Sequence, residues 1–367
     1  MARVTVKTLA TAVGVSPSTI SNAYNRPDQL SPELRERILA QAEALGYAGP
    51  HAAGRMLRSG RAGAVGVLLT ERLSYAFSDP YAIGFLTGLS EVVETDGTSI
   101  VLLPVSLAGE EPDVTAVRQA NIDALTTLCV SDTHPASTLA RARGIRLVST
   151  AVDPDPASSW VAIDDEEAGA LVGAHLSALG HRRVAVVVDT NQPAGGSARE
   201  LADADVTCMD CAARLRGLRQ TLPPEQLSIV SSGHNAVQSG RAAGEWLLDS
   251  ADVPSAIVGT SDVLALGVLQ AMTARGLVVP DDLSVCGFDD ISAAADAGLT
   301  TIRQPIAEKG RRVGELLLDP DASDRQILLP IELVTRATTG QARTSSAGTA
   351  GFGGRRVTGS RPPARGR

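Results

Sequence analysis

The apolar residues at the start of the chain recur with the period of a helix. In the first segment they lie three and four positions apart: Val6, Leu9, Ala10 and Val13. This spacing predicts a short amphipathic helix, and Thr5 just before it is a suitable N-cap.

A second helix is predicted directly after a turn at Gly14. Ser16 can cap it by accepting a hydrogen bond from a free backbone N–H, and Pro17 suits the first helical position because it has no N–H. Two short helices across a Gly-containing turn form a helix-turn-helix, whose second helix offers its side chains to the major groove of DNA. The outward-facing residues are small and polar: Ser18, Ser21 and Asn22. Asn suits the reading of adenine, and Ser can pair with several bases.

A third helix follows, with Ser31 as its cap and Pro32 as its first residue. Its apolar residues form a stripe that Gly46 ends: Leu34, Ile38, Ala42 and Leu45. Three helices of this size can share one small core.

From residue 64 onward, short β-branched runs alternate with helical patterns. The predicted strands are residues 64–70, 99–105, 124–130, 145–149, 161–163, 183–188, 228–230, 256–259 and 283–287. The predicted helices include residues 82–94, 165–179, 212–220, 238–248, 262–275 and 306–318. Such alternation indicates parallel sheets with helices on both faces, and this length exceeds one compact core, so we expect two similar lobes. A ligand is then expected at the carboxyl ends of the strands, in a cleft between the lobes.

Charge is distributed unevenly along the 367 residues, whose net charge is −8. Residues 1–61 hold eight Lys or Arg and four Asp or Glu, giving +4, and residues 341–367 hold six Arg and no acid, giving +6. The remainder therefore carries −18, since −8 − 4 − 6 = −18. A basic head on an acidic body is typical of a protein that touches phosphate with one end only.

Other features of the composition bound the location and chemistry. Apolar runs are too short for a membrane span and the N-terminus lacks a secretory layout, so we expect a cytoplasmic protein without a membrane partner. The pair Cys208 and Cys211 has the spacing of a redox or metal site, but further ligands close by are missing. We interpret the pair as chance or surface thiols, and we expect no metal and no cofactor.

The motifs of the N-terminal segment resemble those of the lactose-repressor (LacI/GalR) family of bacterial transcription regulators. They include Val4-Thr5-Val6-Lys7-Thr8-Leu9-Ala10, Gly14-Val15-Ser16, Thr19-Ile20-Ser21, Ser31-Pro32 and Leu45-Gly46-Tyr47. Further landmarks follow in family order to about residue 340: Leu179-Gly180-His181, Val279-Pro280-Asp281-Asp282, Gly287-Phe288-Asp289-Asp290, Gln304-Pro305 and Leu333-Val334-Thr335-Arg336. The resemblance implies a helix-turn-helix domain over residues 1–49, a hinge over 50–62, and a two-lobed body over 63–340 that is like a periplasmic binding protein. Residues 341–367 form a basic tail that we expect to be disordered.

The resemblance also implies a homodimer, or a larger oligomer, on double-stranded DNA with a near-palindromic operator. The expected DNA-binding residues of the head are Thr5, Ser16, Pro17, Ser18, Thr19, Ser21, Asn22 and Asn25. Many members carry Arg where this chain has Asn22, so no known operator can be transferred.

In the family, the hinge segment becomes helical on DNA and a leucine enters the minor groove. Leu57 matches that leucine, with Arg55 as a further DNA-binding residue. One extra residue, Gly49, makes Met56 a competitor for the same role, and a flexible tether without a role in DNA binding is the alternative.

The effector implied by the resemblance is a small polar molecule, commonly a sugar. Arg214 and Asp289 match the family's effector-contacting arginine and aspartate, and Ser261 stands where an asparagine is common. Four more candidates lie near predicted strand ends: Phe77, Asp79, Asp153 and Phe288. Aromatic residues make up only 3% of the chain, which leaves a nucleoside or another metabolite open. Two further residues have other expected roles: Asp164 either caps a helix or contacts the ligand, and Trp246 is expected in the core.

Together these observations predict a transcriptional regulator, with repression favoured over activation, that responds to a small effector. Two other classes of protein fit the sequence less well. An enzyme is disfavoured because nucleotide-binding, nucleophile-elbow and zinc-protease motifs are missing from the sequence. A nucleoid-packaging protein is disfavoured because the acidic body would serve no purpose.

Overall fold

The structure is a computed structural model that describes residues 4–49, 60–69, 73–105, 113–131, 133–190 and 198–343. The predicted hinge residues Arg55, Met56 and Leu57, and most of the basic tail, lie outside these ranges. Among the described residues, no helix combines the length and the apolar character that a membrane crossing requires.

The head consists of the three predicted helices, and their capping residues are confirmed. The elements are α1 (Val6–Val13), α2 (Pro17–Asn25), the 3-10 helix η1 (Pro27–Gln29) and α3 (Pro32–Ala44). Ser16 accepts the Thr19 N–H at 3.1 Å, and Gly14 ends α1 with a left-handed φ of 77° that suits glycine. One buried cluster joins the three helices: Leu9, Ala10, Ile20, Ala23, Ile38 and Ala42.

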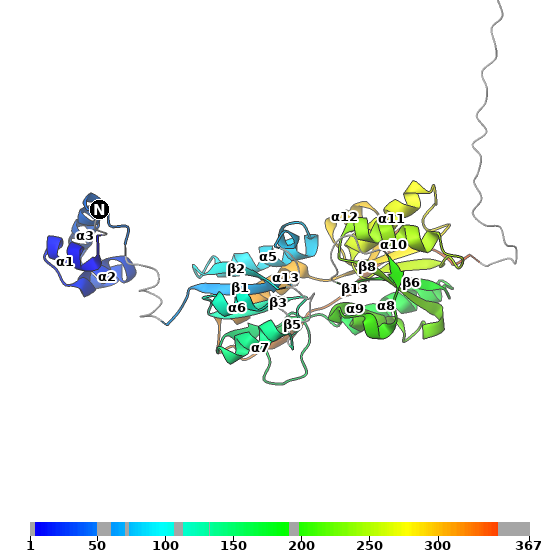
Figure 1. Ribbon diagram of the computed structural model, residues 1–367, viewed down its shortest axis with the longest axis horizontal. Coiled ribbons are helices and arrows are strands. Elements are labelled where there is room, and N and C mark those ends of the chain that lie inside the picture. Colours follow the sequence, from blue (N-terminus) through cyan, green and yellow to red (C-terminus); the bar gives the residue numbers. More distant parts are fainter. Residues whose placement is uncertain are drawn as a thin grey trace, which may run out of the picture. The chain divides into compact units, whose positions relative to one another are not determined.

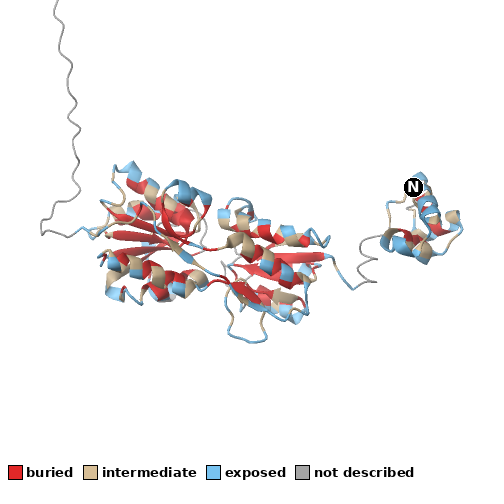
Figure 2. Ribbon diagram, turned by 180° about the vertical axis from the view of Figure 1, so that it is seen from behind, coloured by how far each residue is buried: buried red, intermediate tan, exposed pale blue. Residues whose placement is uncertain are grey.

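The chain divides into two compact units, of which the first includes the head, and each unit is built from two separate stretches of the chain. The first contains residues up to Ala162 together with Ile306–Leu329, and the second contains Ile163–Pro305 and the residues from Pro330 on. Figure 2 shows that buried residues concentrate on the strands of each unit and on the inward sides of the helices.

Unit 1 holds a parallel sheet with strand order β2-β1-β3-β4. Its strands are β1 (Ala64–Leu69), β2 (Ser99–Pro104), β3 (Ala124–Leu128) and β4 (Arg146–Val148), and a separate parallel pair joins β5 (Trp160–Ala162) to β12 (Gln326–Leu328). Beyond the head, the described helices of this unit are η2 (Tyr75–Phe77), α5 (Pro80–Val93), α6 (Thr115–Gln119), α7 (Pro135–Ala142) and α13 (Ile306–Leu318). Helices α5 and α13 pack closely together, because Gly88 lets the two backbones meet: a Cβ on this residue would lie 1.9 Å from the Ala307 carbonyl oxygen.

Unit 2 holds a mixed sheet with strand order β13-β11-β10-β9-β6-β8-β7. Its strands are β6 (Val184–Asp189), β7 (Arg199–Glu200), β8 (Leu227–Gly233), β9 (Ala256–Gly259), β10 (Ser284–Asp289), β11 (Thr300–Arg303) and β13 (Glu332–Val334). Its α-helices are α8 (Asp165–Ala178), α9 (Met209–Leu218), α10 (Val237–Leu248), α11 (Asp262–Ala274) and α12 (Ser292–Asp296); two short 3-10 helices are η3 (Asp203–Asp205) and η4 (Pro224–Gln226). Figure 1 shows α10, α11 and α12 on one face of the sheet and α8 and α9 on the other. The central strands are parallel and the edge strands β7 and β13 are antiparallel.

The predicted parallel sheets with helices on both faces are confirmed, and so are the predicted strands and helices within a few residues at their ends. The short strands β7, β11, β12 and β13 and the short helices α6, α7 and α12 were not predicted. The prediction that Trp246 lies in the core is wrong, because this residue of α10 is 39% exposed.

Candidate functional site

Polar residues from three elements gather at the carboxyl edge of the unit 2 sheet. Asp289 is the last residue of β10, and Thr260 follows the neighbouring strand β9. Arg214 reaches the same edge from α9, where its guanidinium donates to the Thr260 carbonyl. Strands run in parallel here, so their carboxyl ends lie side by side, which is the usual ligand-binding edge of such a sheet.

Arg214 is a buried cation with several partners. Its Nε donates to Asp165 Oδ1 at 2.8 Å, and its guanidinium carbon lies 4.7 Å from the centroid of the Phe288 ring. Burial alone would lower the pKa of Arg214, but the carboxylates of Asp165 and Asp289 outweigh it and raise that pKa well above its ordinary value. The side chain is therefore a fixed positive charge at the edge of the sheet.

Asp289 occupies a strained position. Its backbone φ is 118°, which a non-glycine residue rarely adopts, and the residue is only 6% exposed. Gln304 donates its side-chain amide to Asp289 Oδ1 at 2.7 Å. Strain of this kind persists only where surrounding contacts enforce it, and it is common at ligand-binding sites.

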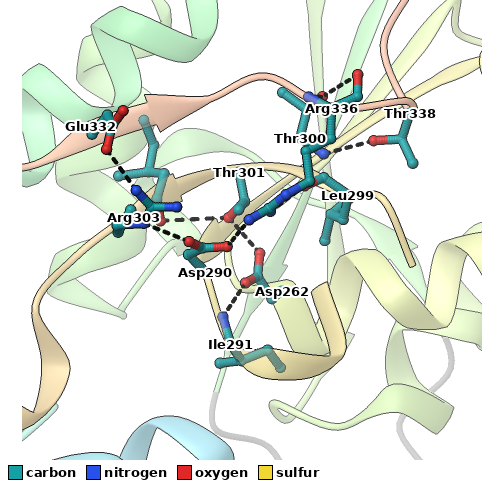
Figure 3. Close-up of polar contacts among 11 residues, drawn as sticks. Asp262, Asp290, Ile291, Leu299, Thr300, Thr301, Arg303, Glu332, Arg336 and Thr338 are labelled. Carbon is teal, nitrogen blue, oxygen red and sulfur yellow. Dashed lines mark hydrogen bonds and ion pairs between the residues drawn. The ribbon is translucent and has the colours of Figure 1, made fainter. Parts of the chain in front are cut away.

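A network of charged residues supports the turn after β10 (Figure 3). Asp290 accepts from Arg303 Nε at 2.7 Å and from Arg336 Nη2 at 2.6 Å. Burial acts to raise the pKa of Asp290, but these two arginines hold it below its ordinary value. Behind them, Asp262 accepts from Thr301 Oγ1 at 2.6 Å and from the Ile291 N–H at 2.9 Å. Asp262 is fully buried, and burial raises its pKa to about 7.

Two other predicted residues of unit 2 have structural partners. Ser261 caps α11 by accepting the Leu264 N–H at 3.2 Å, and its hydroxyl donates to Asn235 Oδ1 at 2.6 Å. Phe288 is fully buried beneath Arg214, so it supports that cation and has no exposed face that could line a cleft.

The remaining effector candidates lie in unit 1. Asp79 is buried and caps α5 through the Ala82 N–H at 2.8 Å, while the Phe77 residue is 70% exposed. Burial raises the pKa of Asp79 despite that hydrogen bond. Asp153 lies in a different place, in the loop after β4, where its Oδ1 accepts the Asp155 N–H at 2.9 Å.

On α2, the predicted DNA-reading side chains are exposed or half-buried. Ser16, Pro17 and Ser18 are exposed at its start. Asn25 donates to the Ser21 carbonyl at 2.9 Å, and Asn22 donates to Gln29 Oε1 at 3.3 Å. The polar side chains of the second half of the helix are thus oriented by neighbouring groups.

Part of the chain, residues 174–339, matches the periplasmic binding protein-like domain. Over 354 residues the chain is 37% identical to an HTH-type transcriptional regulator of Mycolicibacterium smegmatis, which covers 92% of this chain and 97% of that protein. Among solved structures, the lac repressor dimer bound to operator and the anti-inducer ONPF is 25% identical with a TM-score of 0.70, covering 92% of this chain and 100% of that one. The chain belongs to the LacI/GalR family of transcriptional regulators.

A further solved structure, the transcriptional regulator CelR–cellobiose complex, shares the fold of this LacI/GalR-family regulator. It has a TM-score of 0.62 at 24% identity and covers 92% of this chain and 100% of that one.

Several supporting residues of this LacI/GalR-family regulator were missed from the sequence. Asp165, Asn235, Thr260 and Gln304 each contact a predicted residue in unit 2, and Gln29 orients Asn22 in the head. Gln304 belongs to a family landmark, Gln304-Pro305, which could have indicated it. Asp164 caps α8 through the Glu167 N–H at 2.8 Å, so its expected capping role is confirmed.

The cysteine pair also differs from its expected description. Cys208 caps α9 by accepting the Cys211 N–H on its sulfur at 3.3 Å, and Cys211 is 4% exposed. The prediction of surface thiols is therefore wrong for Cys211. Within the described ranges, no group of three or more His, Cys, Asp or Glu is placed to hold a metal ion.

Proposed function

We propose that this LacI/GalR-family regulator is a repressor that binds a near-palindromic operator as a homodimer and releases it in response to a sugar. The DNA-reading part is α2 in the head, and the effector-binding part includes Arg214 and Asp289 in unit 2. Operator binding also implies that the protein acts in the cytoplasm.

The proposal for DNA rests on the exposed polar start of α2 and on charge. Ser16, Pro17 and Ser18 lie at the exposed N-terminal end of that helix, the end that a helix-turn-helix directs to base edges. The first 61 residues carry +4, whereas the acidic middle carries −18, so phosphate attracts the head and repels the body. The solved lac repressor dimer on its operator, which has 25% identity to this chain, supports the same arrangement here.

The proposal for a sugar rests mainly on Arg214 and Asp289. Each of these charged groups can pair with two neighbouring hydroxyls, the pattern that a sugar presents. Asp289 supplies acceptors and Arg214 supplies donors at one edge of the sheet, where the carboxylates of Asp165 and Asp289 both raise the pKa of Arg214. The expectation that the effector lies between the two lobes stays a prediction.

The effector can change DNA binding only if it prefers one of two conformations of the protein. The factor by which the effector changes the operator affinity is limited by the ratio of the effector's affinities for the two conformations. The operator changes the effector affinity by the same factor. A measured tenfold loss of operator affinity would thus require a tenfold weaker effector affinity for the DNA-bound protein.

A footprint on the upstream DNA of its own gene, at two salt concentrations and with a panel of sugars, tests both parts. Protection of one short two-fold-symmetric site, released by one sugar, is the expected result. Uniform coating that only weakens with salt would refute operator reading. A specific footprint that none of the sugars changes would refute the sugar while retaining the regulator.

Variants assign each part to its residues. Asn22→Ala should weaken binding to the protected site by about tenfold to a hundredfold, because a bidentate base contact contributes about 1–3 kcal/mol. Thr11→Ala is the matched control, since Thr11 is an exposed residue of α1 whose hydroxyl donates to the Lys7 carbonyl. Equal effects of the two variants would contradict the assignment of α2.

For the effector, Arg214→Lys keeps the charge but removes the planar fork, so release by the sugar should be lost while the footprint stays. Arg216→Lys is the control on the same helix, because Arg216 is exposed and pairs with Glu166 at 3.0 Å. Retained release in Arg214→Lys would contradict the proposed contact.

A further inference from the structure

Unit 1 contains a cavity of about 600 Å³, and Asp153 is the one effector candidate among its lining residues. It lies between the start of β4, the loop after that strand and the segment before β12. Its charged lining residues are Arg141, Arg146, Arg325, Asp153 and Asp155. Thr133, Ser158 and Ser159 line it as well.

Arg146 is held in this cavity with unused hydrogen-bonding capacity. One of its guanidinium nitrogens donates to the carbonyl of Leu317, near the end of α13. Its buried Nε has no acceptor among the residues that the structure describes. This Nε is enclosed by the protein, so a ligand in the cavity would reach Arg146 through the terminal nitrogens of its guanidinium.

Arg325 places a second guanidinium on the same cavity. Its Nε donates to the Ala322 carbonyl at 2.9 Å and one terminal nitrogen donates to the Pro320 carbonyl at 2.8 Å. Burial lowers the pKa of Arg146, and the positive charges of Arg325 and Arg61 lower it further, which the carboxylates of Asp319 and Asp123 offset only in part. The two cations therefore repel each other, and an anion between them would relieve that repulsion.

Asp153 and Asp155 provide acceptors in the same cavity. Asp153 uses Oδ1 for the Asp155 N–H, and Asp155 uses Oδ1 for the Ala157 N–H, both at 2.9 Å. We propose that this cavity binds a small phosphorylated polyol or sugar, with its phosphate on Arg146 and Arg325 and its hydroxyls donating to Asp153 and Asp155. Guanidinium forks suit phosphate oxygens, and carboxylates suit hydroxyl donors.

The DNA backbone fits the cavity less well than a small ligand does. A phosphodiester chain carries a negative charge at every nucleotide and offers no hydroxyl donors in DNA, so the two aspartates would repel it. A polyol phosphate confines its charge to one end and presents donors at the other. This inference does not depend on the proposed effector in unit 2.

Tryptophan fluorescence can report on the cavity directly. The chain has 2 tryptophans, and the indole N–H of Trp160 donates to the Asp153 carbonyl at 3.1 Å. In full-length protein carrying Trp246→Phe, only Trp160 contributes to the signal. The titrants are glycerol 3-phosphate, inorganic phosphate, glycerol and a short DNA duplex, at constant ionic strength.

We expect a saturable change with glycerol 3-phosphate at a roughly millimolar midpoint, a weaker one with inorganic phosphate and none with glycerol. Arg325→Gln and Arg146→Gln, each in this background, should raise the midpoint by at least about tenfold because each removes a charge-assisted contact. Arg325 is exposed, so we expect Arg325→Gln to keep the fold even if Arg146→Gln unfolds the protein. Arg275→Gln, which removes an arginine from unit 2, is the control for net charge and should leave the midpoint unchanged.

Three results would overturn the proposal. One is the lack of a saturable response to glycerol 3-phosphate, and another is an unchanged midpoint in Arg325→Gln. The third is equal affinity for glycerol 3-phosphate and inorganic phosphate, which would remove the role of the hydroxyls. A response to short duplex DNA in place of glycerol 3-phosphate would assign the arginines to the nucleic acid backbone.

Discussion

The buried carboxyl of Asp262 makes the stability of unit 2 depend on pH near neutrality. Burial raises its pKa from the ordinary value of 3.8 to about 7. A raised pKa means that the folded protein holds the proton more tightly than the unfolded chain does. The stability that this proton contributes is therefore fully present below about pH 4 and is lost as the pH rises through about 7.

The magnitude follows from that difference in pKa. One pKa unit corresponds to about 1.4 kcal/mol, so the full loss is about 4 kcal/mol, of which about 3 kcal/mol falls between pH 5 and pH 8. Asp262→Asn should remove this dependence, because an amide is neutral at every pH and has the shape of the protonated acid. Its amide can still donate to Thr301 Oγ1 and accept the Ile291 N–H, so both hydrogen bonds shown in Figure 3 are retained with the hydroxyl reoriented.

Urea denaturation at pH 5 and pH 8, followed by the transition of unit 2, measures the effect. The wild type should lose about 3 kcal/mol more than Asp262→Asn between the two pH values. Asp249→Asn is the control, since its side chain is 72% exposed and pairs with Arg275 at the surface. An equal pH dependence in the wild type and Asp262→Asn would refute the assignment of the titration to this carboxyl.

Two further predictions concern packing and capping. Gly88→Ala should destabilise unit 1 by about 3 kcal/mol, at the upper end of overpacking costs, because its Cβ would meet the Ala307 carbonyl oxygen at 1.9 Å. Gly84→Ala on the same helix should cost less than about 1 kcal/mol, since its Cβ would meet a methyl group of Ile306 at 3.1 Å. Thermal unfolding of both variants measures the two costs, and an equal or larger loss of stability in Gly84→Ala would contradict the prediction. Ser16→Ala should destabilise α2 by about 1 kcal/mol, because the helix loses its N-cap. Circular dichroism of the head region and the operator affinity would both detect this loss. Unchanged values of both would contradict the capping role.

Local features of this protein were determined by the sequence itself. The N-caps Thr5, Ser16 and Ser31 were predicted because a cap involves residues only three positions apart. Long strands such as β6 and β10 were predicted because their residues are apolar on both faces, as expected for strands buried between helices. The short strands β12 and β13 carry no such signal, since each forms only against a strand far away in the chain.

The composition of the sites was decided by the tertiary structure. Arg214 and Asp289 could be proposed from family motifs, but the pairing of Arg214 with Asp165, 49 positions away, required the fold. The same holds for the burial of Phe288, for the pKa of Asp262 and for the cavity that joins Arg146 to Arg325. Charge, burial and hydrogen bonding in these places arise from groups that are distant in sequence, and only chain folding sets the distances on which electrostatic and packing energies depend.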